Sequence, residues 1–346
     1  MQLRRFWHVD PSRNHDTTLR APMDVLIVEP IPVEVQQWLA ARHAVRLAPE
    51  LAHEPIAFRV ALAPVRAAIL PPSVTLDASV LWHAPRLQVV GRVSAGSENI
   101  DLDACGRASV EIVRAASASA VAEAEFVIAA LLAMKRRVPV LTDEGLLVGR
   151  ELGGSQVGIV GATPATEPLS RLLNAFGARV AGYDPGVHAS DPAWVRAGVR
   201  PLALQDLVRE CDAVCVLLSH YTRFDGLFGH HLLSTARHNQ VIVSLAHSAI
   251  FDEQALAQAL REGPLAAVWL DSLEPGALDP GRPLRHIDTL QVTPCVASTT
   301  REARLRAAWV VAERIDAVLR MRVSSRALKP ASPGGPAGPA NVPETA

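Results

Sequence analysis

The sequence predicts an α/β protein with two doubly wound parallel-sheet lobes. Short runs rich in Val and Ile alternate with amphipathic helical patterns, which is typical of βαβ units. This alternation occurs in two successive series, one starting at Asp24 and the other at Gln156. The chain has 346 residues, of which 49% are hydrophobic, so it is long and apolar enough to form two cores.

The first series follows residues 1–22, which lack apolar periodicity and are expected to form a loose N-terminal extension. The segment DVLIVE at 24–29 predicts a strand, and VEVQQWLAARH at 33–43 predicts a helix. Further strands are expected at 67–70, 87–92 and 110–114. Polar or Pro-containing segments separate these elements, as in a parallel sheet whose strands are joined by helices.

A long helix is expected from Val121 to Arg137, with Phe126, Ile128, Leu131 and Leu132 on its apolar face. It leads into the second series. Strands of this series are expected at 156–161, 178–185, 212–218, 240–246, 265–271 and 289–293. A final helix is expected at 299–321, with an apolar stripe at Leu305, Ala308, Trp309, Ala312, Ile315 and Leu319. Residues 324–346 are rich in Pro, Gly and Ala and predict a disordered tail.

Composition excludes several classes of function. The chain has 34 basic and 35 acidic side chains, a net charge of −1, which argues against a general binder of nucleic acid or anionic membranes. No apolar run approaches the roughly 20 residues of a membrane span, and no secretory signal is visible, so we expect a cytoplasmic protein. The four cysteines are too scattered for a disulfide framework, and no metal site is expected.

The strand QVGIVG leads into the turn GATPAT and then into a helix, as at dinucleotide-binding sites. At such sites the helix N-terminus offers N–H groups to the pyrophosphate. An acid at the end of the next strand accepts the ribose hydroxyls, and Asp184 lies 184 − 161 = 23 residues after Gly161. An acid at this position favours NAD over NADP.

The G-x-G-x-x-G pattern of this turn keeps only its first glycine. It reads Gly161, Ala162, Thr163, Pro164, Ala165 and Thr166. Thr163 either pushes the cofactor outward or replaces the lost backbone contact with its hydroxyl. Pro164 and Pro168 predict that the helix begins late, with Thr163 or Thr166 as its cap. The alternative is a lobe that keeps this shape without the cofactor.

Six segments, in this order, carry a family resemblance: VVGRVSAGSENIDLDAC, VAEAEFVIAALLAMKRRV, YDP, VSLAHSAIFDEQALAQAL, LDSLEPGALDPGRPL and TPCVASTTREA. With them, residues from about 87 to 321 resemble the D-isomer-specific 2-hydroxyacid dehydrogenases, in particular the phosphoglycerate dehydrogenase-like branch. The resemblance implies a Rossmann-type NAD-binding domain at 119–296, inserted into a flavodoxin-like substrate domain at 23–118 and 297–323. It also implies a homodimer.

In that family an arginine in V-N-x-A-R-G binds the substrate carboxylate, a histidine in T-P-H exchanges the proton, and a glutamate in E-P orients the histidine. Glu274 matches the glutamate, but His247 stands at the arginine position and Cys295 at the histidine position. An imidazole is shorter than a guanidinium and has fewer donors, and a thiol matches neutral-pH proton transfer less well than an imidazole. Either His247 takes over proton transfer, with Glu274 or a water completing the relay, or these three residues belong to a decayed site.

The resemblance therefore implies an NAD-dependent oxidoreductase acting on a small 2-hydroxy or 2-oxo acid. The alternative is a catalytically impaired relative, a weak NAD-binding or structural dimeric protein. The expected catalytic residues are His247, Glu274 and Cys295. The expected cofactor-binding residues are Gly161, Thr163, Pro164, Ala165, Asp184, Leu245 and Asp271. The backbone N–H groups of Ala95, Gly96 and Ser97 are expected to bind the substrate carboxylate as an anion nest.

Overall fold

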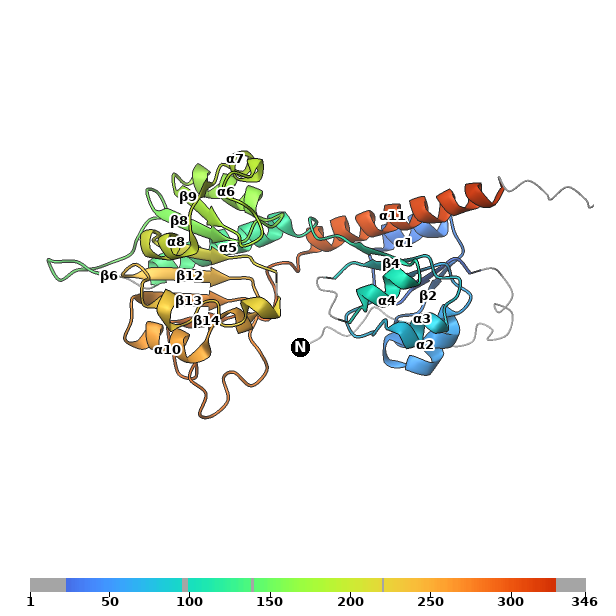
Figure 1. Ribbon diagram of the computed structural model, residues 1–346, viewed down its shortest axis with the longest axis horizontal. Helices are drawn as coiled ribbons and strands as arrows, with labels where there is room; N and C mark the ends of the chain where they lie inside the picture. The colour runs from blue at the N-terminus through green and yellow to red at the C-terminus, as the bar shows by residue number, and fades with distance from the viewer. Residues whose placement is uncertain (1–22, 95–98, 138–139, 220, 328–346) are drawn as a thin grey trace, which may run out of the picture.

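The computed structural model describes residues 23–94, 99–137, 140–219 and 221–327. It has two lobes, each built on one parallel sheet (Figure 1). The predicted N-terminal extension (1–22), the predicted carboxylate nest (95–97) and most of the predicted tail lie outside the described residues.

The first lobe contains a five-stranded parallel sheet in the order β2-β1-β3-β4-β5, which is the flavodoxin-like order. Its strands are β1 (Val25–Ile27), β2 (Val45–Leu47), β3 (Ala67–Ile69), β4 (Val89–Arg92) and β5 (Glu111–Arg114). Its helices before β5 are α1 (Val33–Ala40), the 3₁₀ helix η1 (Pro49–His53), α2 (Pro55–Leu62), α3 (Ala78–Trp82) and α4 (Leu102–Arg107). The central strands are buried on both faces, as their continuous apolar runs predict.

Helix α11 (Arg301–Ala327) returns to this first lobe from the end of the chain and packs on β4, β5 and α1 (Figure 1). Ala308, Val311 and Ile315 on its inner face are fully buried. A Cβ at Gly91 of β4 would lie 2.2 Å from Cγ1 of Val311, so only glycine allows this close packing. The helix runs past residue 323, where the sequence predicts the domain to end.

The second lobe contains a seven-stranded parallel sheet in the order β10-β9-β8-β11-β12-β13-β14. Its strands are β8 (Gln156–Val160), β9 (Arg179–Tyr183), β10 (Arg200–Pro201), β11 (Ala213–Val216), β12 (Gln240–Ser244), β13 (Leu265–Leu270) and β14 (Leu290–Val292). Because the strand order reverses between β8 and β11, the crevice at their carboxyl ends is the expected ligand position of a doubly wound sheet.

Helices cover both faces of this second sheet, with a separate apolar core on each side. They are α5 (Ala120–Arg137), α6 (Thr166–Ala175), α7 (Pro192–Ala197), α8 (Leu204–Glu210), α9 (His230–Leu233) and α10 (Glu253–Arg261), with the 3₁₀ turns η2 (Thr222–Phe224) and η3 (Ser248–Ile250). Helix α5 leads from the first lobe into the second and buries Val127, Leu131 and Met134 in one of the two cores.

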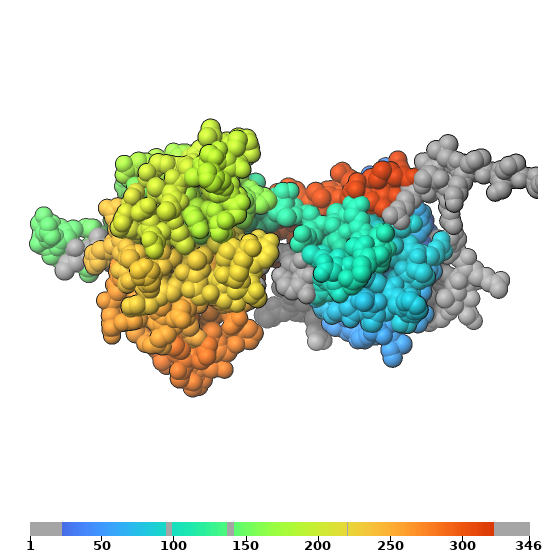
Figure 2. Space-filling view, viewed as in Figure 1, coloured from blue at the N-terminus to red at the C-terminus, as the bar shows by residue number. Residues whose placement is uncertain are grey.

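A two-stranded antiparallel hairpin of β6 (Val140–Leu141) and β7 (Leu147–Val148) projects from the second lobe (Figures 1 and 2). Leu146 and Leu147 are 61% and 70% exposed on it. In the part of the chain that the structure describes, no helix is both long and apolar enough to cross a bilayer.

The predicted fold class is confirmed, because both doubly wound sheets form and every predicted strand contains an observed one. The sequence did not predict β2, β10 or the hairpin. These strands have only two or three residues, too few for an alternating pattern to show.

Candidate active site

The sequence-predicted site residues of the second lobe meet at one edge of its sheet. All seven strands are parallel, so the loops that follow them emerge at the same carboxyl edge. Gly161 follows β8 and Asp184 follows β9. His247 follows β12, Glu274 follows β13 and Cys295 follows β14, so the three expected catalytic residues lie on three adjacent loops.

Gly161 begins the dinucleotide-type turn at the point where the strand order reverses. Its φ is +119°, a conformation that favours glycine. A Cβ at this position would lie 2.8 Å from the backbone nitrogen of Leu218 and 2.9 Å from the carbonyl carbon of Leu217. The first glycine of the pattern is therefore required by the contact between the turn and the chain leaving β11.

Thr166 closes the same turn with its hydroxyl group. Its Oγ1 donates a hydrogen bond to the carbonyl of Gly161 (2.8 Å) and accepts one from the N–H of Thr163 (3.0 Å). Helix α6 begins late, as the prolines predict, but the predicted cap is wrong. The N-cap residue is Ala165, which makes no side-chain cap, because the Thr166 hydroxyl lies inside the first turn and bonds to the preceding loop.

The carboxylate of Asp184 also holds the turn. It accepts hydrogen bonds from the N–H groups of Ala162 (2.7 Å) and Gly186 (2.7 Å), one on each oxygen. Each carboxylate oxygen has a second lone pair, so Asp184 can still accept from a ribose hydroxyl. Asp184 is partly exposed, which leaves it accessible to a ligand.

The Thr163 hydroxyl provides a test of whether the turn fits a dinucleotide. Its Oγ1 is buried and has no hydrogen-bond partner among the described residues. Leaving such a group unsatisfied costs about 1–3 kcal/mol, and a phosphate oxygen would accept a hydrogen bond from it. The hydroxyl lies just before the N-terminus of α6, where the helix dipole also favours an anion. The residues of the turn therefore fit the pyrophosphate of a dinucleotide.

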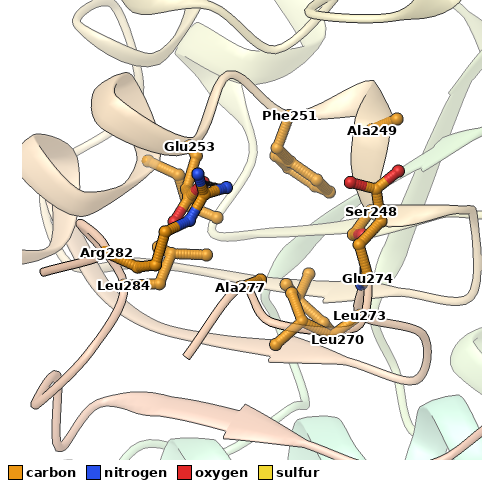
Figure 3. Close-up of a pocket in the computed structure, with 11 residues that line it drawn as sticks. Ser248, Ala249, Phe251, Glu253, Leu270, Leu273, Glu274, Ala277, Arg282 and Leu284 are labelled. Atoms are coloured by element: carbon orange, nitrogen blue, oxygen red, sulfur yellow. Dashed lines mark hydrogen bonds and ion pairs between the residues drawn. The ribbon is translucent and has the colours of Figure 1, made fainter. Parts of the chain in front are cut away.

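His247 caps the short turn η3. Its Nδ1 accepts a hydrogen bond from the N–H of Ala249 (3.3 Å), so a neutral ring carries its proton on Nε2. The next residue, Ser248, ties this loop to the loop after β13, because its Oγ accepts a hydrogen bond from the N–H of Glu274 (3.1 Å). Figure 3 shows the Glu274 carboxylate beside Ser248 and Ala249. His247 and Glu274 thus lie on two directly bonded loops.

Asp271 organises the third loop. Its carboxylate is 5% exposed and accepts from the Thr293 hydroxyl (2.6 Å) and from the N–H groups of Val296 (3.0 Å) and Ala297 (2.9 Å). Its carbonyl accepts from the N–H of Cys295 (2.6 Å), which is exposed and has a φ of +54°. Asp271 therefore fixes the backbone that presents the Cys295 thiol.

The structure says less about two of the expected cofactor-binding residues, Leu245 and Pro164. Leu245 is partly exposed, and its N–H donates to the carbonyl of Val216 in the neighbouring strand. Pro164 is exposed on the turn before α6. Neither placement establishes a contact with a cofactor, so their roles stay predictions.

The sequence reasoning missed residues that brace the predicted substrate-binding segment. The Glu29 carboxylate is 3% exposed and accepts from the N–H groups of Val93 (3.1 Å) and Ser94 (2.9 Å). The Arg92 guanidinium donates to Ser94 Oγ (3.0 Å) and to Asn99 Oδ1 (2.8 Å). These bonds fix Ser94 and Asn99, the described residues on either side of 95–98. The signal available for Glu29 was an acid at the last position of the first predicted strand.

Glu123, in the first turn of α5, was also not predicted as a site residue, although it lies in one of the six segments that carry the family resemblance. Its Oε1 accepts a hydrogen bond from the Ser119 hydroxyl (2.7 Å). Burial raises the pKa of the Glu123 carboxyl above its usual range; the Ser119 hydroxyl opposes the rise, and the negative charge of Asp271 adds to it. Glu123 therefore couples the start of α5 electrostatically to the residue that fixes the Cys295 loop.

We expect Glu123→Gln to stabilise the protein at neutral pH. Folding raises the pKa of Glu123, so the buried side chain favours the folded state while it is protonated, at pH values below about 4. As the pH rises through the folded pKa the carboxyl ionises, and this part of the free energy of unfolding is lost. The glutamine variant has no such loss, so its thermal midpoint should fall less between pH 4 and pH 8. Glu125→Gln, on the exposed face of the same helix, is the control and should follow the wild type. Parallel curves for wild type and Glu123→Gln would contradict the assignment.

Fold and site together define an α/β protein of the dinucleotide-binding class. The family described as "D-isomer specific 2-hydroxyacid dehydrogenase, NAD binding domain" matches residues 128–297. The chain is 31% identical over 268 residues to the (S)-sulfolactate dehydrogenase of Chromohalobacter salexigens, covering 75% of this chain and 86% of the relative. The chain belongs to the D-isomer specific 2-hydroxyacid dehydrogenase family, and NAD is the cofactor of the matched domain.

Two further similarities agree. The chain is 33% identical over 252 residues to the D-3-phosphoglycerate dehydrogenase of Mycobacterium tuberculosis, covering 70% of this chain but 47% of that longer protein. A crystal structure of a Thermus thermophilus protein superimposes with a TM-score of 0.71 and 25% identity, covering 86% of this chain and 97% of that one. The alternative prediction, an impaired relative without turnover, finds no support in these comparisons.

Proposed function

We propose that the chain catalyses reversible hydride transfer between NAD and a small 2-hydroxy or 2-oxo acid, with His247 as the acid–base group. One observation carries this proposal: the bonded loops of His247 and Glu274 lie at the same sheet edge as a turn that fits a pyrophosphate. The bound cofactor supplies or accepts the hydride. The family relationship supports the reaction class.

His247 would supply the proton that the substrate oxygen takes up in reduction. With Nδ1 accepting from Ala249, the proton sits on Nε2 and can be donated to a carbonyl oxygen as that oxygen becomes a hydroxyl. Oxidation runs the same transfer in reverse. Glu274 then returns a proton from solvent to the ring, directly or through a water. Cys295, on the third loop, contacts the substrate, and the backbone of Ala95, Gly96 and Ser97 binds its carboxylate.

The proposed cofactor contacts follow the same edge of the sheet. Gly161, Thr163, Pro164 and Ala165 hold the pyrophosphate, and Asp184 accepts from the adenosine ribose, which favours NAD over NADP. Leu245 and Asp271 lie after β12 and β13 and complete the cofactor-binding set. Of these groups, the Thr163 hydroxyl replaces the contact that a second glycine would allow.

The test is a fluorescence titration with NADH, followed by NADH oxidation with a panel of 2-oxo acids. Thr163→Val keeps the shape but removes the hydroxyl, and we expect it to weaken NADH binding about 10- to 100-fold, since a hydrogen bond to a charged group contributes roughly 1.5–3 kcal/mol. Thr163→Ser keeps the donor and serves as the control. Absence of NADH binding by the wild type would overturn the proposed function, and equal affinity of Thr163→Val would overturn the role of the hydroxyl.

We also propose that residues 23–118 and 297–323 form the substrate domain, that 119–296 form the NAD-binding domain, and that the protein is cytoplasmic. A homodimer is proposed from the same family relationship. The β6–β7 hairpin supports it, because Leu146 and Leu147 are exposed on an arm that projects from the second lobe (Figure 2). Exposed apolar surface of this kind is typical of association sites.

Replacing both leucines of the hairpin should therefore give a monomer. We expect Leu146→Ser with Leu147→Ser to halve the mass measured by light scattering after gel filtration, because the arm would lose the apolar contact with the second copy. The control is the double variant Ile56→Ser, Val60→Ser on α2 of the first lobe, whose side chains are 81% and 72% exposed. An unchanged dimer mass in the hairpin variant would exclude the arm as the interface.

A further inference from the structure

A small cavity in the second lobe is separate from the dinucleotide turn. It lies between η3, the start of α10, the end of β13 and the loop after Glu274, and it has a volume of about 60 Å³ (Figure 3). Most of its wall is apolar. The apolar residues that line it are Ala249, Phe251, Leu256, Leu270, Leu273, Ala277 and Leu284. A cavity of this volume has room for about four to six water-sized groups, which suits a short-chain ligand.

Polar groups stand at two opposite ends of this cavity. Glu253 and Arg282 lie side by side at one end, and Glu274 and Ser248 lie at the other (Figure 3). Nη2 of Arg282 binds Oε2 of Glu253. The second oxygen of the same carboxylate, Oε1, is buried and has no hydrogen-bond partner among the described residues. The Glu253 side chain is 22% exposed, but this one oxygen is buried; an unsatisfied acceptor there is costly, and a ligand donor would relieve the cost.

The charged residues that line the cavity determine whether a cationic or an anionic ligand is favoured. The lining residues carry two carboxylates, Glu253 and Glu274, and one guanidinium, Arg282, which leaves a net charge of −1. A carboxylate ligand would be repelled by both acids, and Arg282 is already engaged with Glu253. A cationic donor is favoured at Oε1, because hydrogen bonds between charged groups are stronger than neutral ones.

We propose that this cavity binds a primary alkylammonium group. Its –NH₃⁺ donates to Oε1 of Glu253, and its hydrocarbon chain lies against Phe251 and the leucines. A water molecule could satisfy Oε1 but would leave the apolar wall hydrated, whereas an alkyl chain removes that wall from water at about 25 cal/mol per Å². This site is additional to the proposed redox function. The alkylammonium site and the proposed redox site share only the end of the cavity at Glu274 and Ser248.

The probe is n-butylammonium chloride, titrated into the full-length protein and followed by saturation-transfer NMR, with sodium chloride holding the ionic strength constant. We expect n-butylammonium to bind at least about 10-fold more tightly than 1-butanol, and butyrate to show no binding. Glu253→Gln should lower the affinity for n-butylammonium about 10-fold. Glu262→Gln, which removes an exposed acid just after the same helix, is the matched control and should bind like the wild type.

A second variant tests the cavity without touching its charges. Ala277 is buried in the wall, and Ala277→Leu should fill the space and abolish binding of both n-butylammonium and 1-butanol. Circular dichroism checks that the variants are folded. If Glu253→Gln does not fold, the binding measurements on Ala277→Leu decide whether the ligand occupies this cavity. Equal affinities for butanol and n-butylammonium, unchanged binding by a folded Glu253→Gln variant, or binding that survives Ala277→Leu would each overturn the proposal.

Discussion

Replacing His247 with alanine is expected to lower kcat by about 10²- to 10⁴-fold, the usual contribution of a positioned general acid–base group. The variant loses the Nε2 proton that we assign to the substrate oxygen. It also loses the Nδ1 acceptor of the Ala249 N–H, which is near the loop surface and can bond to water instead. NADH affinity should change little, because His247 is not among the proposed cofactor contacts.

The measurement is NADH oxidation at saturating 2-oxo acid, together with the NADH dissociation constant of the same variant. His231→Ala is the matched control, since it removes an exposed histidine on α9 of the same lobe and should leave both quantities unchanged. Turnover in His247→Ala equal to that of the wild type would remove His247 from the mechanism. The same assay on Cys295→Ala would then test the remaining side chain on the third loop.

The sequence predicted the sheets well because their strands are buried on both faces. In a parallel sheet covered by helices such strands are continuous apolar runs, and all five residues of β12 are buried. Strand β2 was not predicted, because it lies at the edge of its sheet with Arg46 and Leu47 exposed. An edge strand of three residues has no buried face to impose a pattern.

The candidate site was predictable in position but not in its contacts. Strand ends locate His247, Glu274 and Cys295 because all parallel strands end at the same edge. The bond between Ser248 and the N–H of Glu274 joins residues 26 positions apart, and no sequence pattern specifies it. The Asp271 carboxylate is bonded to the 293–297 loop, which becomes adjacent only after the sheet has formed, so the sequence could not predict these contacts. Its expected contact with the cofactor stays a prediction.

The sequence of the altered dinucleotide turn leaves two alternatives open, and the structure gives one observation that favours one of them. From the sequence, Thr163 either displaces the cofactor or binds it through the hydroxyl. The structure buries that hydroxyl without a partner, which favours binding. Thr166 stands where the pattern has its third glycine, and its hydroxyl bridges the turn from Thr163 to Gly161. The two lost glycines are thus replaced by threonines, whose hydroxyl groups bridge the turn (Thr166) and face the proposed phosphate position (Thr163). The first glycine, Gly161, is kept.

Gly161→Ala is accordingly expected to abolish NADH binding and to destabilise the second lobe. An alanine at a φ of +119° is strained, and its Cβ would lie 2.8 Å from the backbone nitrogen of Leu218, which no side-chain rotation can relieve. We expect a loss of about 2–4 kcal/mol in the free energy of unfolding. The turn must also move away from β11, and this displaces the Thr163 hydroxyl and the start of α6 from the pyrophosphate position.

Gly226→Ala is the matched control, because Gly226 also has a positive φ (+68°) but a Cβ there would meet no atom within 4 Å. It should lose only about 1 kcal/mol and keep its NADH affinity. Urea denaturation and NADH fluorescence measure both quantities for the two variants. The difference between them isolates the backbone contact from the cost of the dihedral angle alone. If Gly161→Ala behaves like Gly226→Ala, the close contact with Leu218 does not shape the cofactor site, and the turn tolerates a side chain at all three positions of the pattern.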